Sequence, residues 1–180
     1  MATVDTDSGR AGTGNDAYRI PKLPVSVVIG MEGGESLEGQ LHLLPVAETH
    51  DGRERIVEML ARPRRFFPLT GRNDARLVNK DRIVTVTVAD PLDAGWVDRD
   101  EESLLDGPGA EDYPEIRMEC RVIGIDSGPR TFRGAVRIIR PPGQQRVMDF
   151  LNDERPFFPL KIDNEILLIN KKYLLDVHQL

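Results

Sequence analysis

The 180-residue chain has a single cysteine, Cys120, and no run of apolar residues long enough to cross a membrane. One thiol excludes an internal disulfide and fits a reducing compartment. Residues 1–16 contain no apolar segment, so no secretory signal is visible. Aromatic side chains are also scarce, at 6% of the residues with one tryptophan. We therefore expect a cytoplasmic protein that makes no contact with a membrane.

The residue patterns of catalysis are missing as well. The chain has no P-loop and no Gly-x-Ser-x-Gly motif. His42, His50 and His178 are scattered, and none has a histidine or cysteine neighbour at metal-ligand spacing. Cys120 shares the inward face of its predicted strand with Met118 and Val122, so it is expected to be a buried structural thiol. We therefore expect no enzymatic activity, no cofactor and no metal site.

Charge is distributed unevenly along the chain, although its 39% hydrophobic and 30% charged residues are typical of a globular protein. Residues 91–115 hold one basic and nine acidic side chains, which indicates a flexible acidic linker. This segment also contains apolar residues that are unusual in such a linker: Trp96, Val97, Leu104 and Leu105. They either dock the linker on the folded protein or form a motif that binds a partner. The other predicted segments are a disordered tail (1–20), a neutral segment (21–90) and a mildly basic one (116–180).

An internal repeat organises the two longer segments. Phe66-Phe67-Pro68-Leu69 recurs 91 residues later as Phe157-Phe158-Pro159-Leu160. The same offset carries Leu77-Val78-Asn79-Lys80 onto Leu168-Ile169-Asn170-Lys171. Such matches, in one order, predict a duplicated unit.

Periodicity predicts the same elements in each copy. Apolar and polar residues alternate over 25–31 and 37–44, and over 117–125 and 132–139, as expected of strands. Apolar residues then recur at helical spacing near 56–60 and 147–151. Gly39 and Gly134 fall within strands and indicate sharp bends or close backbone contacts. Each repeat is predicted as β-β-α-β-β with a bent last strand, and the whole chain as mainly β: two tandem small β-barrels with short helices.

Two recurring residue pairs are candidate interaction sites. Adjacent strand residues point to opposite faces, so one ring of Phe66-Phe67 and one of Phe157-Phe158 must leave its own barrel core. That ring either packs beneath a helix or the linker, or forms an interface. Asn79-Lys80 and Asn170-Lys171 also recur. They are either turn residues, since asparagine favours turns, or two equivalent binding loops.

The end of each repeat resembles the second signature of Sm-like proteins, in which an apolar strand, a polar corner and a final apolar strand follow one another. Residues 77–84 and 168–175 carry this pattern. The whole repeat also resembles a group of uncharacterised bacterial small domains that share an Arg-x-x-Asp-Phe-Leu-Asn segment, as in 146–152. These resemblances imply a small Sm-like or SH3-like barrel and no particular activity.

The leading functional hypothesis is a non-enzymatic protein-interaction or assembly module, with a protein partner or self-association. The alternative is an Sm-like protein that binds RNA or another nucleic acid through a basic stripe. The candidate contacts of that stripe are Arg117, Arg121, Arg133, Arg137 and Arg140. A platform for single-stranded nucleic acid also needs exposed rings among its basic residues. The alternative therefore requires these arginines to converge beside Phe157 or Phe158.

Overall fold

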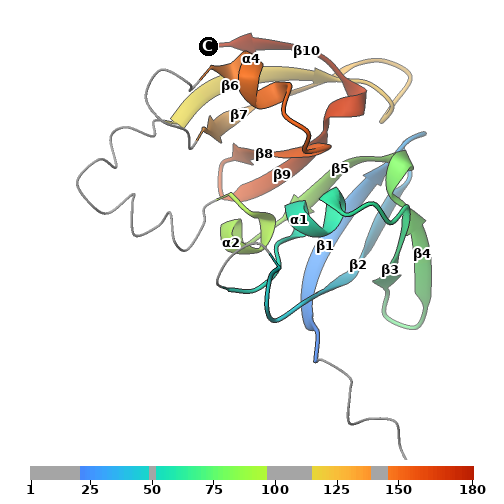
Figure 1. Cartoon of the computed structure of the whole chain (residues 1–180). Coiled ribbons are helices and arrows are strands. Elements are labelled where there is room, and N and C mark those ends of the chain that lie inside the picture. The colour runs from blue at the N-terminus through green and yellow to red at the C-terminus, as the bar shows by residue number, and fades with distance from the viewer. Residues whose placement is uncertain (1–20, 49–51, 97–114, 139–145) are drawn as a thin grey trace, which may run out of the picture.

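In the computed structural model, which describes residues 21–48, 52–96, 115–138 and 146–180, the ten strands form a single antiparallel sheet (Figure 1). The strand order is β10-β6-β7-β8-β9-β5-β1-β2-β3-β4. The first half of the chain (21–96) supplies β1 (Leu23–Met31), β2 (Ser36–Leu43), α1 (Ile56–Ala61), β3 (Phe66–Thr70), β4 (Ala75–Asn79), η2 (Lys80–Arg82), β5 (Ile83–Val88) and α2 (Pro91–Ala94). The second half (115–180) supplies β6 (Glu115–Val122), β7 (Arg130–Arg137), α4 (Val147–Leu151), β8 (Phe157–Ile162), β9 (Glu165–Asn170), η4 (Lys171–Tyr173) and β10 (Leu174–Gln179).

The prediction of a mainly β chain is confirmed, but the prediction of two separate small barrels is wrong. The sheet is continuous because β5 of the first half pairs with β9 of the second. It is not closed, since β10 and β4 lie at opposite ends of the strand order. A unit of about 65 residues buries only a modest share of its surface when it folds alone. Joining the halves through one strand pair buries apolar side chains of both, which is the physical reason why neither half stands as its own barrel.

The strands follow the same order in both halves. The first half runs β5-β1-β2-β3-β4, and the second runs β10-β6-β7-β8-β9. The ladders also share their register: Phe66 lies opposite Asn79 in β3–β4, and Phe157 lies opposite Asn170 in β8–β9. Residues in the strands of one half therefore have structural counterparts in the strands of the other.

A bulge interrupts the last strand of each half at the same place. In the β1–β5 ladder the register shifts so that Val84 is left unpaired. In the β6–β10 ladder the unpaired residue is Leu175. An extra residue of this kind bends its strand and redirects a side chain. Val84 and Leu175 are thus counterparts that leave the regular ladder.

Both predicted strand glycines lie at close backbone contacts. A Cβ atom on Gly39 would come within 2.8 Å of the carbonyl oxygen of Thr70. On Gly134 it would come within 2.3 Å of the carbonyl oxygen of Lys161. These glycines allow β2 to meet β3 and β7 to meet β8, where each strand pair shares a single register position.

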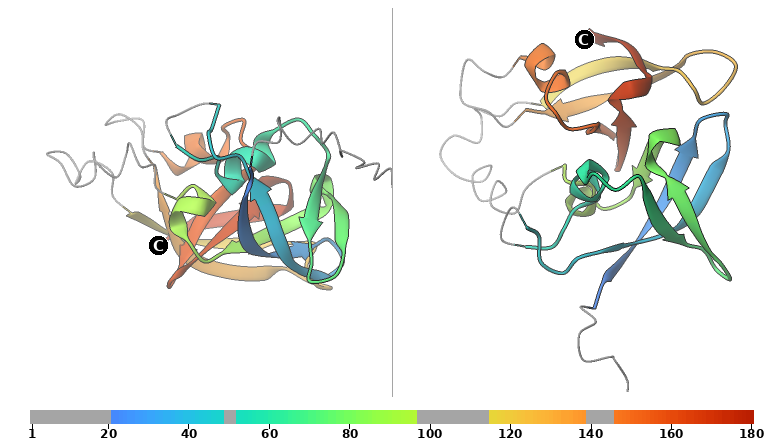
Figure 2. Two further views of the ribbon diagram at one scale, coloured as in Figure 1. Left: turned by 90° about the horizontal axis from the view of Figure 1, so that it is seen from below. Right: turned by 45° about the vertical axis from the view of Figure 1, so that its right-hand side comes forward.

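Short helices lie against the sheet (Figure 2). In α1, Ile56 and Leu60 are fully buried, as the helical spacing predicted. Helix α2 and the buried Trp96 belong to the segment predicted as an acidic linker, and they pack on the first half. The predicted tail, Val97, Leu104, Leu105, His50 and Arg140 lie outside the described residues. No helix in the described ranges is both long and apolar enough to span a bilayer.

Candidate interaction surface

The two halves meet along a seam formed by β5 and β9, which lie side by side in the middle of the molecule (Figure 1). Val86 lies opposite Leu168, and Thr85 lies opposite Ile169. All four residues of β9 from Ile166 to Ile169 are buried. Such a continuous apolar run is typical of a strand that is covered on both faces.

Side chains of β8 and β9 are divided between two hydrophobic clusters. Phe157, Ile166 and Leu168 belong to the cluster of the first half. Phe158 and Ile169, like Leu167, belong to the cluster of their own half. The second half therefore inserts three apolar side chains into the core of the first, and the largest of them is the ring of Phe157.

The first half reciprocates through its bulged residue. Val84 is fully buried and belongs to the cluster of the second half. Its γ-carbon lies 3.5 Å from the position that a Cβ atom on Gly124 would occupy. The seam is thus an exchange of side chains in both directions.

Polar contacts fix the register of the seam at one end. The Asn170 side-chain nitrogen donates to the carbonyl oxygen of Ile83 at 2.7 Å, in a buried position. The Tyr173 hydroxyl donates to the carbonyl oxygen of Asp81 at 2.9 Å, and the Lys172 ammonium donates to the same oxygen at 3.0 Å. These three bonds join the end of β9 and η4 in the second half to η2 and the start of β5 in the first.

Counterparts of the inserted side chains lie exposed at the far edge of the sheet. Phe66, the counterpart of Phe157, is 53% exposed, and Leu77, the counterpart of Leu168, is 74% exposed. In the described chain, β4 pairs only with β3, so its other edge is open. We call these two side chains and the β4 edge the Phe66–Leu77 ridge.

Counterparts of the first half's seam residues line a groove at the opposite end of the sheet. This α4–β10 groove has a volume of about 540 Å³ and lies between α4 and β10. Leu175, the counterpart of the buried Val84, is 48% exposed, and Met148, the counterpart of the buried Val57, is 63% exposed. The groove is lined by Val147, Met148, Leu151, Asn152, Lys171, Leu174, Leu175, Asp176, Val177 and Gln179.

The recurring asparagines hold turns in both halves. The side-chain oxygen of Asn79 accepts a hydrogen bond from Asp81 N, and that of Asn170 accepts one from Lys172 N, each at 3.1 Å. Both asparagines therefore start the 3-10 turns η2 and η4. Asn170 also reaches across the seam, whereas the amide nitrogen of Asn79 donates to none of the described residues.

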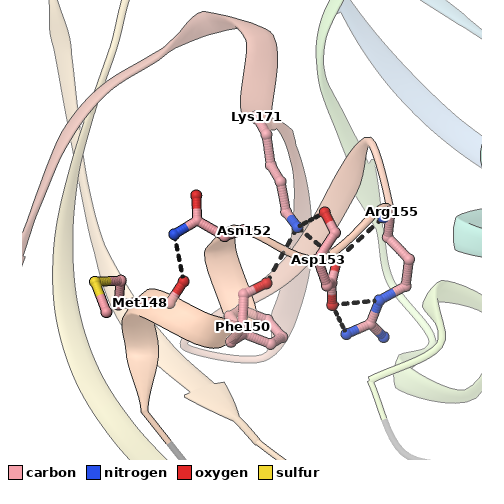
Figure 3. A network of polar contacts seen from close by, with 6 residues as sticks. All are labelled: Met148, Phe150, Asn152, Asp153, Arg155 and Lys171. Atoms are coloured by element: carbon pink, nitrogen blue, oxygen red, sulfur yellow. Dashed lines mark hydrogen bonds and ion pairs between the residues drawn. The ribbon is translucent and has the colours of Figure 1, made fainter.

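The recurring lysines tie each turn to the preceding helix. Lys171 lies in a network around the end of α4 (Figure 3), donating to the carbonyl oxygen of Phe150 at 3.1 Å and to Asp153 Oδ1 at 2.6 Å. Burial raises the pKa of the Asp153 carboxyl, but the hydrogen bonds from Arg155 and Lys171 outweigh it, so that pKa is lowered overall. In the first half, Lys80 donates in the same way to the carbonyl oxygen of Arg62, just after α1. Partial burial lowers the pKa of its ammonium group. Both lysines thus make structural contacts.

The four candidate arginines that the structure describes share the outer face of β6 and β7 but lie among carboxylates. Arg133 lies 2.6 Å from Glu119, and Arg137 lies 3.2 Å from Glu115. Arg121 is paired with Asp176 of β10. Arg117 is exposed on the same strand. Phe157 and Phe158 are buried, so no ring of either is exposed beside these arginines.

The remaining reactive side chains form no joint site in the described chain. Cys120 is fully buried, and burial raises the pKa of its thiol to about 12. His42 bonds to the hydroxyl of Thr70 at 2.9 Å. Among the residues that the structure describes, no three histidine, cysteine, aspartate or glutamate side chains are grouped to hold a metal ion.

Sequence reasoning selected the phenylalanines but missed Leu77, Met148 and Leu175. A signal for Leu77 was available, since the 91-residue offset matches it to Leu168 within a wholly apolar run. Leu175 required knowledge of the bulge, which the sequence pattern does not reveal. A comparison of the chain with protein-family models, with curated proteins and with solved structures finds no match in any of the three.

Proposed function

We propose that this chain is a non-enzymatic interaction or assembly module that binds a protein through the open edges of its sheet. One observation carries the proposal: Phe66 and Leu77 are largely exposed, although their counterparts Phe157 and Leu168 are buried at the seam. Large exposed apolar side chains that cluster on one edge mark contact surfaces. An unpaired strand edge beside them offers backbone hydrogen bonds to a partner strand.

The nucleic-acid alternative has weaker support. Its arginines share one face, but Arg121, Arg133 and Arg137 each pair with a carboxylate. Phosphate binding would require these pairs to exchange for contacts with phosphate, which reduces the net gain. The exposed phenylalanine is Phe66, which belongs to the first half rather than to these strands.

The proposal is tested by capture of partners on the full-length chain from native lysate, with and without nuclease. The variant Leu77→Glu places a charge on the Phe66–Leu77 ridge without touching the core. The matched control is Val46→Glu, because Val46 is equally exposed, at 70%, in the loop after β2. We expect Leu77→Glu to abolish capture of a protein that the wild type and the control both retain, with no effect of nuclease.

Two results would contradict the proposal. Capture that survives Leu77→Glu would show that the ridge is not the contact surface. Capture that nuclease removes, and that Arg133→Glu weakens more than Leu77→Glu, would favour the nucleic-acid alternative.

A further inference from the structure

We propose that copies of this chain associate head to tail: the Phe66–Leu77 ridge of one copy docks on the α4–β10 groove of the next. In this arrangement β4 of one copy pairs with β10 of its neighbour, as β9 pairs with β5 within the chain. The inference rests on the proposed function, because it names the partner of the same edges. The inference is based on the internal seam, where the counterparts of β4 and β10, namely β9 and β5, already pair with each other.

The ridge carries the side chains that such a contact needs. Within the chain, Phe157 and Leu168 enter the first-half cluster, and α1 packs on β8 there. Their counterparts Phe66 and Leu77 have the same ladder register but are largely exposed. A second copy would bury them as the seam buries Phe157 and Leu168.

The groove carries the complementary features. Within the chain, the first half meets β8 and β9 through Val57 of α1 and through Val84 and Val86 of β5. Val57 and Val86 belong to the cluster that Phe157 and Leu168 enter, and Val84 enters the second-half cluster. Their counterparts are Met148, Leu175 and Val177, all of which line the α4–β10 groove. The groove is therefore the first half's side of the seam repeated at the end of the sheet, where it is open.

The seam's register predicts which residues of two copies would meet. Leu168 lies opposite Val86, so Leu77 would lie opposite Val177 of the neighbour. Leu167 lies opposite Thr87, so Arg76 would lie opposite His178 and diagonal to Asp176. Diagonal neighbours on one face of a sheet are within reach of a long side chain, so Arg76 would lie within reach of the Asp176 carboxylate, which pairs with Arg121 in the single chain.

Differences from the seam predict a weaker contact between copies. Arg76 replaces the apolar Leu167, and Gln179 replaces the buried Val88. Helix α2, which follows β5, also packs on β9 at the seam. The described chain has no helix after β10, the counterpart of β5, to make the same contact. We therefore expect weak association that depends on concentration, with a dissociation constant of roughly 10–500 μM.

The geometry of the contact is heterologous, since ridge and groove are different surfaces. Each copy bound leaves one free ridge and one free groove, so growth continues until the arrangement closes into a ring or extends as a filament. A two-fold dimer, in which one surface meets its own copy, would behave differently. This difference supplies the test.

The experiment is sedimentation velocity on the purified full-length chain, with one variant for each surface. Leu77→Glu disables the ridge, and Leu175→Glu disables the groove. We expect the wild-type mass to rise above one chain with concentration, and each variant alone to stay monomeric. An equimolar mixture of the two variants should form dimers and nothing larger, because it contains one intact ridge that fits one intact groove. Val46→Glu should behave as wild type, and thermal unfolding of every variant checks its fold.

Each other result overturns the proposal. A wild type that stays monomeric up to about 500 μM contradicts it, because that concentration covers the expected dissociation constant. If that monomer still loses protein capture through Leu77→Glu, the proposed function survives and the partner is a different protein. Dimers formed by Leu175→Glu alone, or a mixture that stays monomeric, exclude the ridge-to-groove contact.

Discussion

Phe157 and Phe66 occupy the same position in their strand ladders, opposite Asn170 and Asn79, yet Phe157 is 1% exposed and Phe66 is 53% exposed. The difference arises from what lies beside each strand. Phe157 meets the first half of the chain across the seam, whereas no described residue covers Phe66 to that extent. The recurring phenylalanine is therefore a core residue in the second half and a surface residue in the first.

Substitution of these two rings should have unequal effects on stability. Phe157→Ser leaves a cavity in the first-half cluster and should lower the free energy of unfolding by about 3–5 kcal/mol. Phe66→Ser alters an exposed ring and should cost less than about 1 kcal/mol. Urea unfolding followed by the fluorescence of Trp96, the chain's one tryptophan, measures both. Equal losses would mean that Phe66 is also a core residue.

Lys171→Met should destabilise the protein in a manner that depends on pH. The variant removes the ammonium that bonds to Phe150 and Asp153, at a cost of about 1–3 kcal/mol at pH 7. Because the folded pKa of Asp153 is lowered, its contribution to stability is present above the unfolded pKa of about 3.9 and is lost as the pH falls through the folded value. The difference between variant and wild type should therefore shrink below about pH 4.

Lys161→Met is the matched control for this pH dependence. The Lys161 ammonium lies 3.3 Å from Glu115, but both side chains are more than one-third exposed. Such a surface pair contributes about 0–1 kcal/mol. A Lys171→Met cost that is no larger than the Lys161→Met cost, or that stays constant from pH 7 to 3, would argue against the network around α4.

Gly134→Ala tests the close contact between β7 and β8. The added methyl group would meet the Lys161 carbonyl oxygen at 2.3 Å, and backbone cannot move aside easily. We expect a loss of about 1–3 kcal/mol in unfolding free energy. Gly128→Ala is the control, since nothing lies within 4 Å of its added methyl group. Similar unfolding midpoints for the two variants would rule out the close contact.

The Cys120 thiol should react slowly in the folded protein. Burial raises its pKa to about 12, so the thiolate is almost absent at pH 8, and the sulfur is also inaccessible. Labelling with a thiol-specific disulfide reagent should be slow in buffer and fast in denaturing urea. Rapid, complete labelling of the native protein at pH 8 would show that Cys120 is accessible.

Local features of the fold were predictable because they depend on short-range patterns. Alternation placed Leu41 and Leu43 on the buried face of β2, and helical spacing placed Ile56 and Leu60 inward. Gly39 and Gly134 were predicted to lie at bends or close contacts, and they do.

The arrangement of the halves was not predictable in the same way. Which strand edge meets which depends on the fit between distant surfaces, and alternation within one strand does not encode it. The run from Ile166 to Ile169 did carry a signal, since a strand without alternation is buried on both faces. The ion pairs of the candidate arginines were partly predictable. Glu115 and Glu119 share a face of β6 with Arg117 and Arg121 through their spacing of two residues, whereas Asp176 reaches that face only when β10 pairs with β6.

Pairing of β4 with β10 between copies can be measured directly by disulfide formation. Arg76→Cys and His178→Cys each place a thiol at an exposed strand position, and the seam's register sets the two opposite each other in neighbouring copies. Residues opposite each other in adjacent strands bring their Cβ atoms to about 4.5–5.5 Å, close to what a disulfide needs.

The measurement is the yield of disulfide-linked dimer after mild oxidation of an equimolar mixture of the two variants. We expect a high yield from Arg76→Cys with His178→Cys, a low yield from either alone, and a low yield from Arg76→Cys with Val46→Cys. A yield from the paired mixture no higher than from the Val46→Cys mixture would contradict the head-to-tail contact.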